Sequence, residues 1–237
     1  MPVTALYPHS RRINYILWPI FISGGKTMGL KDLFRKLFGG KIFKKKHVRL
    51  GIYGPPNAGK TTLANRILVD WGLEEEMGPI SEIPHETRHA MEKQNVQIGH
   101  DNKSMKIDII DTPGVATKVD FHEFVESYGM DEDSGKRRAR EATEGIIEAI
   151  KWLDEVEGVL LVMDASVDPY NQINITLIGN LEARSIPILI VANKIDLEDA
   201  SGTALKDAFP QHPVVPVSAM NGLNMDKLYR GMIKHFR

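Results

Sequence analysis

A turn rich in glycine and proline, GPPNAGKT at residues 54–61, constrains the fold of this chain more than any other feature. It follows the apolar run VRLGIYG and precedes KTTLANRILVDW, in which apolar residues recur at helical spacing. The turn fits the pattern G-x-x-x-x-G-K-[ST], whose glycines let successive backbone N–H groups converge on phosphate oxygens where a helix begins. We therefore expect a strand, a phosphate-binding turn and a helix in succession.

We call residues 54–61 the phosphate loop. In this interpretation Lys60 reaches the β- and γ-phosphates of a nucleotide, and the Thr61 hydroxyl coordinates Mg²⁺. The alternative, a fortuitous glycine-rich turn, is disfavoured by the strand before it and the helix after it. The residues expected to line the nucleotide are Gly54, Pro55, Pro56, Asn57, Ala58, Gly59, Lys60, Thr61 and Thr62.

A second motif, IDIIDTPGV, continues the same site. Its apolar strand ends in Asp111, which brings a carboxylate beside the phosphate loop, where it can hold Mg²⁺ through a water. Gly114 offers a backbone N–H that can approach the γ-phosphate. Together the two motifs predict a site for a nucleoside triphosphate.

A third motif, VANKID, bears on the choice of base. Asp196 can accept hydrogen bonds from the ring N–H and the exocyclic amine of guanine, a donor pair that adenine lacks, so ATP would leave a buried acceptor unpaired. Asn193 is expected to bridge the phosphate loop and the base, with the Lys194 stem over the ring. The next strand ends in VSAM, where Ser218 and Ala219 are expected to place backbone N–H groups against the guanine carbonyl.

From Val48 onward, strand-like apolar runs alternate with helix-like segments. This alternation predicts an α/β domain with a mostly parallel six-stranded sheet and helices on both faces. The runs at 159–163 and 186–192 are almost continuously apolar, as expected for central strands buried on both faces. Residues 71–95 and 112–135 interrupt the alternation directly after the first two motifs, and loops of that length are usually functional or mobile.

Composition and charge divide the chain in two. With 237 residues, 42% hydrophobic and 26% charged, the chain is expected to form one globular domain with an appendage. It has no cysteine, which excludes disulfides and thiolate chemistry and fits a cytoplasmic protein. Residues 1–47 hold ten Lys/Arg and one Asp, a net charge of +9, whereas the other 20 basic and 30 acidic residues give residues 48–237 a net charge of −10.

The basic segment at residues 28–47 predicts an amphipathic helix and a linker. Its apolar residues recur three and four apart, opposite a basic face; they are Leu30, Leu33, Phe34, Leu37 and Phe38. Three interpretations remain open: binding to an anionic membrane surface, packing onto the rest of the chain, or binding to rRNA. The apolar run in the preceding residues 1–27 is too short to span a bilayer. We expect these residues to be disordered or a non-native extension, with Met28 as the true start.

The order of these motifs resembles that of the small GTPases, and GPPNAGKTTLANRIL with DTPG resembles their Era-like branch. The resemblance covers residues 48–237 and implies a Ras-like GTP-binding domain, but without the KH-type RNA-binding domain that follows it in Era. In PHETRHA, which is similar to the first switch of that branch, the resemblance places Thr87 over Mg²⁺ and the γ-phosphate. It also implies a molecular switch in which residues 78–95 and 112–135 are ordered by GTP and released by GDP.

Two features bear on how such a domain would hydrolyse GTP. Val115 stands where Ras-like proteins orient the attacking water with Gln, and valine cannot form that hydrogen bond. Asn57 resembles the asparagine that helps coordinate K⁺ in potassium-stimulated relatives, although it also fits a role in shaping the turn; Arg88 suits a surface ion pair better than an internal arginine finger. We therefore expect a slow, K⁺-stimulated GTPase that uses Lys60, Thr87, Gly114 and Asn57.

The alternative is a GTP-dependent binding module at a membrane surface or ribosome, with negligible hydrolysis until a partner arrives. A GTP-dependent dimer is a further expectation of the resemblance. Cellular GTP places the protein in the cytoplasm, peripheral to the inner membrane surface if residues 28–47 bind lipid.

Overall fold

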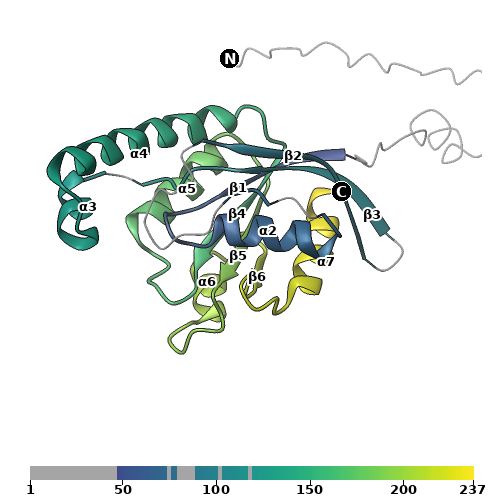
Figure 1. Ribbon diagram of the computed structural model, residues 1–237. Coiled ribbons are helices and arrows are strands. Elements are labelled where there is room, and N and C mark those ends of the chain that lie inside the picture. Colours follow the sequence, from purple (N-terminus) through teal and green to yellow (C-terminus); the bar gives the residue numbers. More distant parts are fainter. Residues whose placement is uncertain (1–46, 74–75, 79–88, 101–102, 117–118) are drawn as a thin grey trace, which may run out of the picture. The chain divides into compact units, whose positions relative to one another are not determined.

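The computed structural model describes residues 47–73, 76–78, 89–100, 103–116 and 119–237. They contain a six-stranded sheet in the order β2-β3-β1-β4-β5-β6 (Figure 1). Neighbouring strands are parallel except for the antiparallel pair β2 and β3, which confirms the predicted α/β architecture. The strands are β1 (His47–Tyr53), β2 (Met91–His100), β3 (Lys103–Asp111), β4 (Gly158–Asp164), β5 (Ile188–Asn193) and β6 (Val214–Pro216).

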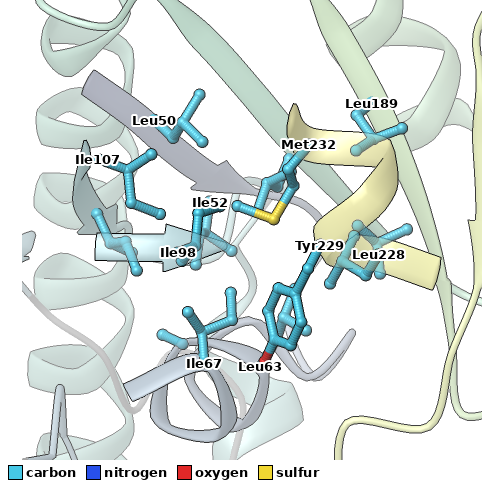
Figure 2. Packing of buried hydrophobic residues seen from close by; sticks show 14 of the residues in the cluster. Leu50, Ile52, Leu63, Ile67, Ile98, Ile107, Leu189, Leu228, Tyr229 and Met232 are labelled. Atoms are coloured by element: carbon cyan, nitrogen blue, oxygen red, sulfur yellow. The ribbon is translucent and has the colours of Figure 1, made fainter. Parts of the chain in front are cut away.

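Helices cover both faces of the sheet, as predicted. On one face, α2 (Lys60–Asp70) and α7 (Met225–Phe236) share a core with alternate residues of β1 to β5, shown in Figure 2. On the other face, α4 (Glu132–Trp152), α5 (Gln172–Ala183) and α6 (Gly202–Ala208) share a second core. Burial of this apolar surface is the main favourable term in folding. The helices packed on both faces therefore hold the strands, and with them the strand ends, in fixed positions.

The two central strands behave as their sequences predict. Every residue of β5 is buried, as are the first six residues of β4. Parallel strands buried on both faces read as continuous apolar runs, and their first polar residues mark the carboxyl ends. Those residues, Asp164 and Asn193, are Cα partners at the same edge of the sheet.

Three elements differ from the sequence-based expectation. The interruption expected to last to residue 95 already contains β2 from Met91, an edge strand of which only two residues are buried. Within the expected interruption at 112–135, α3 spans Phe121–Tyr128, and α4 begins at Glu132 instead of 136. Asp120 and Asp131 cap these helices by accepting backbone N–H bonds, a local signal that stands outside the apolar periodicity.

The last predicted strand, at 214–219, is shorter than expected. β6 ends at Pro216, and the chain then turns so that Ser218 and Leu223 exchange backbone hydrogen bonds. Among the described helices, none is long and apolar enough to cross a membrane. The expectations for residues 1–46, Thr87 and Arg88 fall outside the described residues.

Candidate functional site

The phosphate loop connects β1 to α2 with an unusual backbone. Gly54 has φ 154° and Gly59 has φ 90°, both in the region that favours glycine. Asn57 also has a positive φ of 58°, which asparagine tolerates better than most residues. The loop is therefore shaped by glycines at the two positions that the pattern requires and by Asn57 between them.

The Lys60 side chain is folded back into the loop. It is 6% exposed, and its ammonium donates to the Pro55 carbonyl at 2.8 Å. Burial lowers the pKa of Lys60 to about 8, although nearby Asp111 opposes the shift. A buried cation in this position favours an incoming polyanion, which would restore the charge that burial penalises.

Asp111 and Thr61 meet directly. The Thr61 hydroxyl donates to Asp111 Oδ2 at 2.7 Å, and Asp111 is fully buried. Burial raises the pKa of Asp111 to about 6, against the opposing effects of Thr61 and Lys60. Among the described residues Asp111 Oδ1 finds no hydrogen-bond partner. A buried carboxylate oxygen without a partner, beside a hydroxyl, fits a small divalent cation such as Mg²⁺.

The segment after Asp111 is tied to the phosphate loop by two bonds. The buried Thr112 hydroxyl donates to the Ile52 carbonyl at 2.7 Å, and the Val115 N–H donates to the Gly54 carbonyl at 3.2 Å. Gly114 lies between these anchors, close against Pro56. The role of Thr112 was not predictable, because a buried threonine in a loop is indistinguishable in sequence from an exposed one.

Asn193 joins the phosphate loop, which it was expected to contact, to the VSAM segment, which it was not. Its amide donates to the Ala58 carbonyl at 2.9 Å, and its side-chain oxygen accepts from the Ala219 N–H at 3.0 Å. Both contacts are buried. One side chain thus holds three segments together: the turn after β1, the end of β5 and the loop after β6.

In the rest of the third motif, Lys194 makes a partly buried contact and Asp196 is exposed. Lys194 has φ 66° and its ammonium lies 2.6 Å from Asp164 Oδ2. Asp196 is exposed at the edge of this region, and the Ile195 N–H donates to the carbonyl of Val217, the residue after β6. Asp164 was absent from the predicted site because its partner is distant in sequence.

A further contact links β2 to α4. Glu148 accepts from the Ala90 N–H at 2.9 Å and lies 3.0 Å from His89 Nδ1. Ala90 immediately precedes β2 and is the last residue of PHETRHA, the predicted first switch. Glu148 therefore fastens the start of β2 to the long helix that follows the Asp111 motif.

The fold and this site define a P-loop nucleotide-binding domain of the GTPase class. A family model described as "50S ribosome-binding GTPase" matches residues 49–194. The chain therefore belongs to this family.

Relatives and solved structures agree with that assignment. GTPase Era of Clostridium acetobutylicum is 28% identical over 78% of this chain and 54% of its own length. GTPase Der of Acetivibrio thermocellus is 27% identical over 90% of this chain and 46% of its own. The chain thus spans about half the length of these relatives.

Two solved structures share the fold at 22% identity. One is an Era variant of Aquifex aeolicus bound to GDP·AlF4⁻, with a TM-score of 0.60 over 81% of this chain and 57% of that one. The other is Era in complex with MgGDPNP and part of 16S ribosomal RNA, with a TM-score of 0.61 over 81% and 58%. They support the Ras-like fold of this chain.

Proposed function

We propose that this chain is a guanine-nucleotide switch that binds GTP and hydrolyses it to GDP and phosphate. The observation that carries the proposal is the position of Asn193, which bonds both the phosphate loop and the Ala219 segment. It brings the phosphate-binding and base-binding motifs to one edge of the sheet, where ligands of open α/β sheets bind. Asp196 then supplies the acceptor that distinguishes guanine from adenine.

Lys60 has a defined part in this proposal. Its ammonium donates to the Pro55 carbonyl, and burial lowers its pKa to about 8. The β- and γ-phosphates would replace that carbonyl as acceptors and keep the amine protonated, since a nearby negative charge favours the charged form. The lysine would then stabilise the charge that develops on the phosphates during transfer.

The residues present fit Mg²⁺. Thr61 and Asp111 would hold it, with Thr87 as a third proposed ligand outside the described residues, and Mg²⁺ would neutralise charge between the β- and γ-phosphates. Gly114, fixed by the flanking Thr112 and Val115 bonds, would offer its N–H to the γ-phosphate.

The pH dependence of Mg²⁺ binding tests Asp111. Because burial raises its pKa to about 6, a proton competes with Mg²⁺ below that pH. We expect Mg²⁺ affinity, measured in the GDP complex, to rise about tenfold per pH unit up to about pH 6 and then level off. Asp111→Asn should remove this dependence and weaken Mg²⁺ binding, with no loss of stability in the nucleotide-free chain, since the amide still accepts from Thr61. Mg²⁺ affinity that is flat from pH 5 to pH 7 would contradict the assignment.

The position of Val115 favours a second candidate function, a GTP-dependent binding module that needs a partner for hydrolysis. Its partly buried side chain packs against the second core, and because it is apolar it cannot orient the attacking water by a hydrogen bond. Partner-free turnover discriminates between the two functions. A measurable rate supports the self-sufficient switch, whereas tight GTP binding without turnover supports the module.

A finer proposal is that K⁺ stimulates hydrolysis by supplying positive charge at the phosphates in place of an arginine finger. Asn57 is exposed on the phosphate loop, where its side-chain oxygen suits a K⁺ ligand. Its positive φ of 58° suits a purely conformational role equally well. Two substitutions separate these roles, since Asn57→Gly keeps the backbone conformation and removes the oxygen.

We expect hydrolysis by the unaltered chain to be several-fold faster in KCl than in NaCl, and Asn57→Gly to abolish this difference while leaving GDP affinity within a factor of about three. Asn180→Asp, an exposed change on α5, is the control. Equal rates in the two salts, or K⁺ stimulation that survives in Asn57→Gly, would contradict the K⁺ role.

The proposed partner is ribosomal RNA. The matched family is described as ribosome-binding, and one structural neighbour is bound to 16S ribosomal RNA. In this chain the excess of basic residues at 1–47 would supply the salt-dependent attraction to phosphates. Binding to an anionic membrane and a GTP-dependent dimer stay predictions, as does a cytoplasmic location.

A further inference from the structure

We propose that Asp164 is a positioning residue for guanine-nucleotide binding, acting by holding Lys194 in place. The inference rests on the proposed function, because it assigns a supporting residue to the same nucleotide site. It concerns a carboxylate at the end of β4, outside the phosphate loop and the third motif.

Asp164 is held on both of its oxygens. Oδ1 accepts from the Ser166 N–H at 2.9 Å and from the Ser166 hydroxyl at 2.6 Å. Oδ2 lies 2.6 Å from the Lys194 ammonium. The side chain is only 17% exposed, so this is a sheltered, charge-assisted contact. The two hydrogen bonds from Ser166 thus fix the orientation of the carboxylate that contacts Lys194.

Register brings the two residues together. Asp164 and Asn193 are Cα partners at the ends of β4 and β5, and the Ala165 N–H donates to the Asn193 carbonyl at 2.8 Å. Lys194 follows directly in a left-handed conformation, which turns the chain out of the strand. The carboxylate therefore stands beside the first residue that leaves β5.

An anchored Lys194 differs physically from a free one. A lysine side chain has many rotamers, and ordering it when a ligand binds costs free energy. With its ammonium fixed to Asp164, the aliphatic stem is already ordered before a purine ring packs against it. The Asp164 carboxyl is also held in its ionised form. Burial raises its pKa, but the hydrogen bonds from Lys194 and Ser166 outweigh burial, so the pKa of Asp164 is lowered.

Asp164 also faces the phosphate loop. It lines a pocket of about 500 Å³ together with Pro55, Pro56, Asn57 and Ala58. A carboxylate left without Lys194 would lie near the loop that receives phosphates, and its charge would repel them. The ion pair therefore both orients the lysine and neutralises a carboxylate that would oppose nucleotide binding.

A double-mutant cycle tests this inference with a fluorescent GDP analogue. Asp164→Asn keeps an acceptor for Ser166 but loses the charge that holds Lys194, and we expect its affinity for the analogue to fall about tenfold or more, mainly through faster dissociation. In a Lys194→Ala background the same substitution should leave affinity unchanged or raise it, because there is no lysine left to hold and the unpaired carboxylate that repels phosphates is gone. A merely structural role would give the same loss in both backgrounds.

Two further variants complete the design. Asp154→Asn removes a carboxylate that pairs with Arg184 on the surface and should leave affinity unchanged. If Asp164→Asn does not fold, Ser166→Ala frees Oδ1 and should give a smaller loss that likewise disappears in the Lys194→Ala background. Wild-type affinity in Asp164→Asn, or equal losses in both backgrounds, would overturn the inference. Failure of the unaltered chain to bind the analogue would instead refute the proposed function.

Discussion

Replacement of Lys60 by alanine is expected to weaken GTP binding by at least about 100-fold, the effect of removing one partner from a buried, hydrogen-bonded charge pair. The lysine is 6% exposed, and its ammonium donates to the Pro55 carbonyl. Its burial lowers the pKa to about 8, a cost that a bound triphosphate would offset. Isothermal titration with a non-hydrolysable GTP analogue at pH 7.5 measures the loss.

The matched control is Lys227→Ala, which removes an exposed lysine from the first turn of α7. It should leave GTP affinity unchanged. Thermal unfolding of both nucleotide-free variants shows whether the fold is kept, since alanine also removes the bond to Pro55. A folded Lys60→Ala variant with wild-type affinity would contradict the role of the phosphate loop.

The second large effect is on stability. Gly54 passes so close to β4 that a Cβ added there would lie 2.1 Å from the Val162 carbonyl oxygen, a backbone atom that cannot move aside cheaply. Its φ of 154° adds strain for any residue with a side chain. We expect Gly54→Ala to lower the free energy of unfolding by at least about 3 kcal/mol, measured by urea denaturation, because overpacking and backbone strain add.

Gly179→Ala is the control for Gly54. Gly179 lies in α5, and an added Cβ would meet nothing within 4 Å. Alanine there should raise the free energy of unfolding by about 0.5–1 kcal/mol, the difference in helix propensity. Equal effects of the two substitutions would show that the close approach of Gly54 to β4 does not limit stability.

The parts of the fold that were predictable from sequence are those specified locally. The phosphate loop is a contiguous pattern, and β4 and β5 are continuous apolar runs, so their positions follow from sequence without knowledge of the partners. The order of the motifs then places them at one sheet edge, since parallel strands end together. Asn193 and Ala219 lie at that edge and also bond each other, a contact that the motifs do not predict.

The elements that the sequence did not predict, β2 and α3, depend on contacts with neighbouring elements and have only a weak apolar pattern of their own. β2 packs only Val96 and Ile98 deeply into the core, which is too weak an apolar pattern to predict a strand. Helix α3 is set by its Asp120 cap and by Gly129 in a left-handed conformation, within a stretch with no long apolar repeat. Edge elements of this kind receive much of their stability from neighbours that the local sequence does not reveal.

The supporting side chains of the site illustrate the same limit. Asp164 meets Lys194 across 30 residues of sequence, and Glu148 meets Ala90 across 58. Each pairing is fixed by how strands and helices pack, so the residue types alone could not identify it. Long-range contacts of this sort emerge only once the sheet register is known.

The measurement that tests the central claim most directly is a competition of GTP and ATP for the unaltered chain, compared with Asp196→Asn. We expect the unaltered chain with Mg²⁺ to bind GTP at least about 1,000-fold more tightly than ATP, because adenine leaves the Asp196 acceptor unpaired, and Asp196→Asn to lose most of that preference. Similar affinities for GTP and ATP, or a preference for GTP that survives in Asp196→Asn, would contradict the account.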